Sequence, residues 1–139
     1  MTKSAPAGTA PATYSVDASA QNAGDTGTGF ANITVVPTPP PITISLSVPN
    51  PTYPQNSTVP ITATVIQNAS PVSGASVTFT LTRPDTSTTT KAIATGSNGQ
   101  ATWSYKINPK AIKGTYTVTA QTTYGSQSAT ASAITFTVQ

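Results

Sequence analysis

The chain has 139 residues and a net charge of +3; only 6% of its residues are charged, and it contains no cysteine and no histidine. It also lacks glutamate, so Asp17, Asp25 and Asp85 carry the only side-chain carboxylates. We therefore expect no enzyme active site, no metal site, no cofactor and no disulfide framework, because each needs residue types that are absent or sparse here.

Alternation with a period of two residues is the clearest pattern in the sequence, and it predicts β-strands. Gly114–Thr123 is the most regular example, with Tyr116, Val118 and Ala120 on one side and mainly threonine on the other. Threonine makes up about a fifth of the chain, and thirteen prolines argue against long helices. The prediction is an all-β protein in which an antiparallel β-sandwich encloses an apolar core.

The first 36 residues form a small predicted unit of two strands. Ala12–Ala20 and Phe30–Val35 alternate as strands do, and the turn-rich segment Gln21–Gly29 lies between them with three glycines. We expect a hairpin with its turn in that segment.

This hairpin has an echo near the end of the chain. The sequence around Tyr14 matches that around Tyr116 at a spacing of 102 residues, and Ile33–Val35 matches Phe136–Val138 at a spacing of 103. Recurrence at about one domain length is typical of tandem arrays. We therefore expect residues 1–36 to be the C-terminal hairpin of a truncated preceding domain of the same type.

A proline-rich linker, residues 37–41, separates this hairpin from a complete module, residues 42–139. Its prolines favour an extended, semi-rigid spacer. Within the module, Gly96–Gly99 is a predicted tight turn, in which Asn98 and Gly99 tolerate positive φ. Seven strands are predicted: Ile42–Val48, Thr58–Val65, Ala75–Leu81, Thr90–Thr95, Ala101–Tyr105, Gly114–Thr123 and Ala129–Val138.

Three stretches of the module carry a family resemblance: Pro71–Phe79, Gly96–Trp103 and Gly114–Ala120. They resemble bacterial immunoglobulin-like domains of the invasin/intimin type, which are also found appended to secreted enzymes. The likeness covers about half of the chain and implies an Ig-like antiparallel β-sandwich of about seven strands. It also implies that Tyr116 is the tyrosine-corner residue, whose hydroxyl binds nearby backbone. The chain departs from many such domains in having no aspartate in the turn before Gly99.

The resemblance implies a non-catalytic structural or spacer module of a secreted or cell-surface multidomain microbial protein. Its expected partners are neighbouring domains of the same polypeptide, and its expected location is extracellular or at the cell surface. One alternative is an accessory carbohydrate-binding module of a secreted hydrolase, with Tyr53, Tyr124 or Trp103 stacking on sugar rings. Another is an adhesin domain that binds a surface protein.

Two other classes of partner are not expected. Lys106, Lys110 and Lys113 cluster around one loop, but three lysines without stacking aromatic residues fall short of a nucleic-acid-binding surface. The sequence contains no run of eighteen apolar residues, so no membrane insertion is predicted.

Overall fold

The computed structural model describes residues 12–22, 25–35 and 37–139, with side-chain burial described for 37–139. The chain divides into two units, Met1–Pro40 and Pro41–Gln139.

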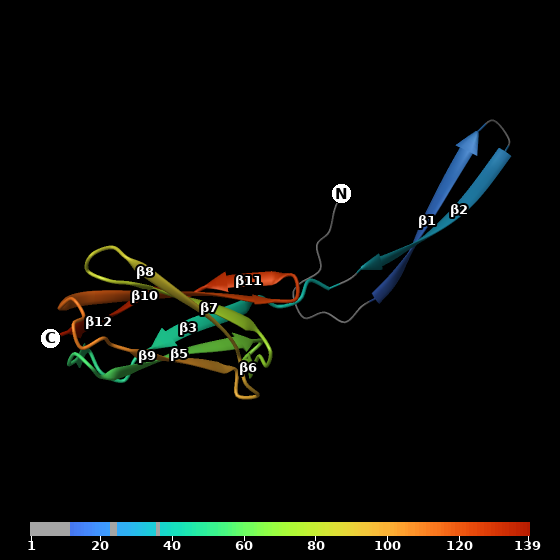
Figure 1. Ribbon diagram of the computed structural model, residues 1–139. Helices are drawn as coiled ribbons and strands as arrows, with labels where there is room; N and C mark the ends of the chain where they lie inside the picture. The colour runs from blue at the N-terminus through green and yellow to red at the C-terminus, as the bar shows by residue number, and fades with distance from the viewer. Residues whose placement is uncertain (1–11, 23–24, 36) are drawn as a thin grey trace. The chain divides into compact units, whose positions relative to one another are not determined.

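The first unit contains a two-stranded antiparallel hairpin, formed by β1 (Ala12–Asn22) and β2 (Asp25–Val35) (Figure 1). The pairing runs without interruption from Ala12 opposite Val35 to Asn22 opposite Asp25. The structure contains the predicted hairpin. The prediction of a long turn over Gln21–Gly29 was wrong, because the two strands take up most of that segment. Glycine weakens a strand without preventing backbone pairing, so a continuous ladder can pass through it.

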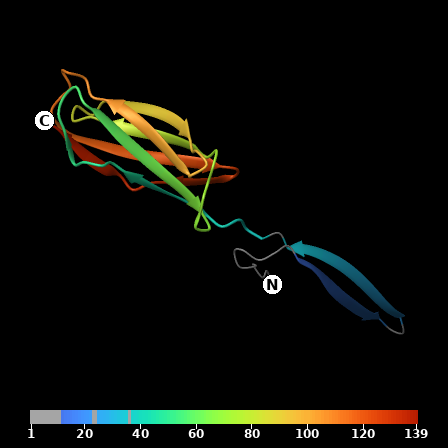
Figure 2. The same ribbon diagram turned by 90° about the horizontal axis from the view of Figure 1, so that it is seen from below.

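The second unit is a β-sandwich of two sheets, whose layers are visible in both ribbon views (Figures 1 and 2). One sheet has the order β4-β12-β10-β7-β8, with β11 paired to β10; in the other, β5 pairs with β3, β6 and β9. The strands are β3 (Ile42–Ser47), β4 (Thr52–Tyr53), β5 (Thr58–Gln67), β6 (Ser70–Pro71), β7 (Ser76–Thr82), β8 (Thr88–Ala94), β9 (Gln100–Lys106), β10 (Gly114–Tyr124), β11 (Gln127–Thr130) and β12 (Ile134–Val138).

This topology is that of an immunoglobulin-like sandwich. Strands β3, β5 and β9 correspond to strands A, B and E of one sheet, and β7, β10 and β12 to strands C, F and G of the other. The remaining long strand, β8, pairs with β7 rather than with β9. Every pairing is antiparallel except the short parallel bridge between β4 and β12. The predicted fold class, an all-β antiparallel sandwich, is confirmed.

Several details of the module differ from the sequence prediction. The single strand expected over Ala129–Val138 is two strands, β11 and β12, because one extra residue interrupts the ladder with β10. Val118 pairs with Ile134 and Gln121 with Thr130, so three residues face two across the break. This is the residue count of a β-bulge. The short strands β4 and β6 were not expected, since two residues show no periodicity.

The predicted Gly96–Gly99 turn is present, but its conformation differs. Only Gly99 has positive φ, at +71°, while Asn98 accepts a hydrogen bond from the Gln100 amide at 3.1 Å. A Cβ at position 99 would come within 2.7 Å of the Val65 carbonyl oxygen. Glycine is therefore required here both by its backbone angle and by the close approach of β5.

The core lies between the two sheets and is built from the inward side of each alternating strand. Phe79 and Trp103 face each other across the two layers, with ring centroids 6.0 Å apart. The Tyr116 ring stacks on Phe136 at 5.3 Å, within one sheet. The largest fully buried side chains are Tyr116, Phe79, Phe136, Ile61, Leu81, Ile107, Val59, Val65, Val77, Val118, Val138 and Thr122. Burying each large apolar side chain contributes about 1.5–3 kcal/mol to stability.

The chain enters and leaves the module at opposite ends. Ile42, at the start of β3, donates its amide to the Gln127 side chain at 3.1 Å, beside the β10–β11 turn. Val138, at the end of β12, pairs with Gly114 at the other end of β10. The loops thus fall into two groups, one at the entry end and one at the exit end.

Candidate functional site

The exit end gathers most of the module's charge, and we call it the cationic end. It comprises the loop between β7 and β8 (residues 83–87) and the segment 105–113, which runs from the last two residues of β9 to the start of β10. Four of the five lysine and arginine residues in the region 37–139 lie there, and the fifth, Lys91, lies on β8. The four are Arg83, Lys106, Lys110 and Lys113. The only side-chain carboxylate in that region, Asp85, is also at this end.

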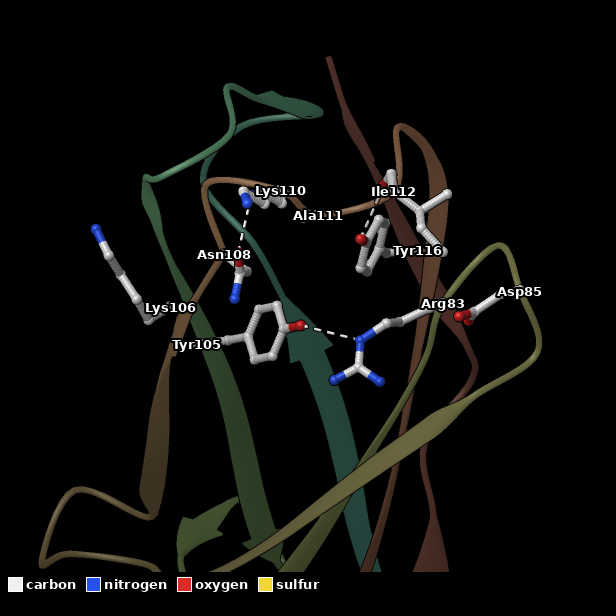
Figure 3. A pocket seen from close by; sticks show the side chains of 9 residues that line it. All are labelled: Arg83, Asp85, Tyr105, Lys106, Asn108, Lys110, Ala111, Ile112 and Tyr116. Carbon is white, nitrogen blue, oxygen red and sulfur yellow. Dashed lines mark hydrogen bonds between the residues drawn. The ribbon is translucent and has the colours of Figure 1, made fainter.

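Arg83 follows directly after β7. Its side chain is held by residues of β8, of β9 and of the loop between β7 and β8. Its Nε donates to the Tyr105 hydroxyl at 3.4 Å (Figure 3). Its two terminal nitrogens donate to Ser87 Oγ at 2.9 Å and Thr89 Oγ1 at 2.7 Å. The hydrogen bond with Tyr105 is the largest cause that raises the pKa of Arg83 above its ordinary value. The guanidinium is therefore fixed in position by neutral groups.

Asp85 is exposed and is held by its own turn. One carboxylate oxygen accepts hydrogen bonds from the Ser87 hydroxyl at 2.6 Å and from the Ser87 amide at 3.0 Å. These bonds, first from the side chain and then from the backbone, lower the pKa of Asp85, and the charge of Arg83 lowers it further. The carboxylate stabilises a tight turn in which Thr86 has positive φ.

Tyr116 lies on β10 and lines the base of the cationic end. Its ring is fully buried, and its hydroxyl donates to the Ile112 carbonyl oxygen at 2.9 Å, four residues upstream. Burial is the main cause that raises the pKa of Tyr116 above its ordinary value. A buried tyrosine near the start of strand F that binds backbone in the preceding loop is a tyrosine corner, as the sequence predicted.

The side chains of the cationic end line a shallow cavity of about 420 Å³. Around it, the Lys106 ammonium donates to the Asn56 carbonyl oxygen, and the Lys110 amide donates to Asn108 Oδ1 at 2.8 Å. Figure 3 shows Arg83 and Tyr105 pointing toward each other across this space. The lining residues are Arg83, Asp85, Tyr105, Lys106, Asn108, Lys110, Ala111, Ile112 and Tyr116.

The three aromatic residues considered for sugar stacking lie in different environments. Tyr124, the last residue of β10 at the entry end, is 43% exposed, whereas Trp103 is 9% and Tyr53 is 6% exposed. Tyr53 was expected on a turn surface, but its ring packs edge-on against Phe136 at 5.6 Å. The cause is the pairing of β4 with β12, which turns Tyr53 into the core. Neither Tyr53 nor Trp103 offers an open ring face, and the three do not form one site.

Sequence reasoning missed the central feature of the cationic end, the contact between Arg83 and Tyr105. The lysines around Lys110 were noted only as too few to form a nucleic-acid-binding surface. The signal that sequence reasoning could have used is the alternation in β9, which places Tyr105 on the same side as Trp103, two residues earlier. The alternation in β9 does not show, however, that β5 pairs with both β3 and β9.

The described residues offer little reactive chemistry. They contain no group of three His, Cys, Asp or Glu side chains that could hold a metal ion. The cationic end presents hydrogen-bond donors and positive charge, which suit binding rather than proton transfer. No helix in the described part of the chain has the length and apolar character of a membrane span.

Comparison with known proteins shows the fold. No protein-family model matches the chain, and no curated protein matches it. Among solved structures, the chain is similar to a crystal structure of a tetra-tandem repeat in the extending region of a large adhesion protein. That structure is 20% identical with a TM-score of 0.55, and the alignment covers 93% of this chain and 32% of that one. This chain thus spans about a third of the length of that structure.

Proposed function

We propose that the chain is a non-catalytic structural module of a tandem array, within a secreted or cell-surface multidomain protein. The observation that carries this proposal is the shared strand register of the first and last hairpins. In the first hairpin Tyr14 lies opposite Ile33, and in the last Tyr116 lies opposite Phe136. These are the residues that the sequence repeat makes equivalent.

The equivalence extends along the whole of both hairpins. Strands β1 and β10 have eleven residues each, and both their first and last residues differ by 102 in number. The turns agree as well, since Asn22 opposite Asp25 corresponds to Tyr124 opposite Gln127 at the same spacing. At the other end, Ala12 opposite Val35 corresponds to Gly114 opposite Val138. The agreement of the two registers over this length supports a common design.

The bulge explains why the repeat spacing changes from 102 to 103. Strand β2 runs through eleven consecutive residues, whereas its counterpart is β11 and β12 with residues 131–133 between them. One added residue in the last hairpin accounts for both the break in its ladder and the longer spacing. Two copies of one design that differ by a single insertion support a tandem origin.

The module's construction suits a spacer that carries tension along the chain. Its N-terminal strand β3 and C-terminal strand β12 leave at opposite ends, so successive modules would extend the polypeptide. Strand β12 is hydrogen-bonded along both edges. It pairs with β10 on one edge, and on the other the Thr137 amide donates to the Pro51 carbonyl oxygen at 2.8 Å. Similarity to a repeat from the extending region of an adhesion protein supports the same role.

The proposed partners are the neighbouring modules of the same polypeptide, and the proposed location is outside the cell. A charge-poor surface rich in threonine and serine, and an apolar core without cysteine, support an exported repeat module. The 139-residue chain would then perform no chemistry and would hold other domains at a distance. A role as an adhesin domain would require, in addition, that the module bind a ligand.

A fusion protein tests the tandem proposal. Residues 42–113, which provide strands β3 to β9, are joined directly to Ala12 so that the first hairpin can complete a second sandwich. Calorimetry should then record an additional unfolding enthalpy of about 60–80 kcal/mol, the usual value for a domain of 100 residues. An enthalpy no greater than that of the 139-residue chain would contradict the equivalence of the two hairpins.

Two variants of the fusion provide the matched control. Val16 is the equivalent of the buried Val118, and Thr13 is the equivalent of the exposed Thr115. Val16→Asp should abolish the added enthalpy, because a charge would have to enter the new core. Thr13→Asp should retain it. Equal effects of the two variants would show that the hairpin does not pack as its counterpart does.

A further inference from the structure

We infer that the cationic end binds the anionic groups of an acidic polysaccharide, through the Arg83 guanidinium and the donors around it. This site is separate from the spacer role, which would hold without it. It also differs from the aromatic stacking considered for Tyr53, Tyr124 and Trp103, since it uses charge and hydrogen bonds at the opposite end from Tyr124.

Arg83 retains two hydrogen-bond donors that the protein does not use. Three of its five N–H groups are donated to Tyr105, Ser87 and Thr89. The remaining two, one on each terminal nitrogen, have no protein acceptor among the described residues, and Asp85 directs its bonds to its own turn. Two unused donors on a fixed, charged guanidinium suit the oxygens of a carboxylate or sulfate.

Besides the carboxylate of Asp85, two further polar side chains at the cavity offer hydrogen-bond donors. The Tyr105 hydroxyl accepts from Arg83, so its own proton is free to donate outward. Asn108 uses its oxygen to accept from the Lys110 amide, which leaves its NH₂ group available. A cavity that presents donors from three side chains and lysines at its rim is complementary to an oxyanion.

Charge is distributed unevenly between the two ends of the module. The entry-end turns, residues 66–75, 95–100 and 122–129, contain no charged side chain. The cationic end contains four positive side chains and one negative one. A one-sided concentration of charge attracts polyanions to that end, and the attraction weakens as salt is added.

The shape and lining of the cavity favour a polysaccharide over a nucleic acid. Nucleic-acid single strands are usually held by exposed aromatic faces on which bases stack. Here Tyr116 is buried, and the Tyr105 ring packs edge-on against Trp103 at 5.3 Å. An open cavity of about 420 Å³ lined by hydroxyl, amide and guanidinium groups fits an acidic sugar residue and its hydroxyls.

Weak binding at one module would suffice in an array. If successive modules repeat the site, a long polysaccharide chain could contact several of them. Linked sites raise overall binding strength by about 10² to 10⁴ without new contacts at any single site. A shallow, exposed cavity of this kind is therefore most effective when it is repeated.

Affinity electrophoresis of the 139-residue chain tests the inference. The gels contain polygalacturonate, which carries carboxylates, dextran sulfate, which carries sulfates, or neutral dextran. Retardation by one or both anionic polymers at low salt, with none by neutral dextran, is expected, and the two gels identify which oxyanion is preferred. Absence of retardation by both anionic polymers would overturn the inference.

Single-charge variants separate a site from general attraction. Lys110→Gln and Lys91→Gln each remove one exposed positive charge, but only Lys110 lines the cavity. Lys110→Gln and Arg83→Lys should weaken binding about tenfold, as for loss of a charge-assisted hydrogen bond, whereas Lys91→Gln should change it little. Equal weakening by Lys110→Gln and Lys91→Gln would overturn the site.

One variant should strengthen binding. Asp85→Asn removes the negative charge beside the cavity, and its side-chain oxygen can still accept both hydrogen bonds from Ser87. We expect stronger retardation, corresponding to severalfold tighter binding, with an unchanged melting temperature. Unchanged or weaker retardation, or equally tight binding of single-stranded DNA with the same dependence on Lys110, would contradict an acidic-polysaccharide site.

Discussion

The two hairpins of this chain have the same register but different surroundings, and the comparison shows what a sandwich adds to a strand pair. Strands β10 and β12 are flanked by β7 and β4 and covered by the opposite sheet, so Tyr116 and Phe136 are almost fully buried. Strands β1 and β2 form a two-stranded sheet. An isolated two-stranded hairpin is marginally stable at best in water. Equivalent sequence positions should therefore contribute very differently to stability.

The largest expected difference concerns the aromatic pair at the centre of the last hairpin. Phe136→Ala should destabilise the sandwich by about 3–5 kcal/mol, because it leaves a cavity beside Tyr116. Ile33→Ala, at the equivalent position, should change the same unfolding transition by less than about 0.5 kcal/mol. Urea denaturation monitored by Trp103 fluorescence measures both. Similar losses in the two variants would mean that the hairpins share one core.

A smaller difference is expected at the two equivalent tyrosines. Tyr116→Phe removes the hydrogen bond to the Ile112 carbonyl and should cost about 1 kcal/mol, whereas Tyr14→Phe should leave the sandwich unaffected. The same denaturation series measures the two variants. A loss at Tyr14 as large as that at Tyr116 would count against the comparison.

Tyr116 should also make stability depend on alkaline pH. Burial raises the pKa of Tyr116 in the folded protein above its ordinary value of about 10. As pH rises past that ordinary value, the unfolded chain loses this proton before the folded one does, so stability is complete below pH 10 and declines above it. Unfolding measured between pH 8 and the folded-state pKa should show a steeper decline for the natural protein than for Tyr116→Phe. Parallel curves would contradict this assignment.

One buried position of the last hairpin should give a gain in stability. Thr122 is fully buried, and its hydroxyl has no hydrogen-bond partner among the described residues. Its equivalent in the first hairpin is Ala20, at the same spacing of 102. Thr122→Val should stabilise the sandwich by about 1 kcal/mol, since a methyl group replaces an unpaired buried hydroxyl. A lower denaturation midpoint would show that the hydroxyl has a partner, such as a bound water molecule.

The sequence predicted the long strands because their patterns are local. Alternation in Gly114–Thr123 is enough to place Tyr116 and Val118 inside, and the structure agrees. The repeat with the first hairpin was also visible, as was the change of spacing, although the bulge behind it was not. Each strand can be recognised from a few consecutive residues, and the repeat can be recognised by comparing two such stretches.

What the sequence could not predict depends on contacts between distant segments. Tyr53 is buried only because a two-residue strand meets β12, and no periodicity marks such a short bridge. Arg83 and Tyr105 are 22 residues apart and meet because their strands end together. The candidate site at the cationic end is of this second kind. Charge and composition hinted at its lysines, but only the fold brings the guanidinium to them.

Hydrogen exchange in the fusion protein tests the central claim most directly. In the sandwich, residues Thr117–Thr123 of β10 pair with β7, and Ser15–Gln21 of β1 are their equivalents. With residues 42–113 placed before Ala12, the amides of Ser15–Gln21 should become protected to the level of global unfolding, as those of Thr117–Thr123 are. If they exchange equally fast with and without the added residues, the first hairpin is not the counterpart of the last.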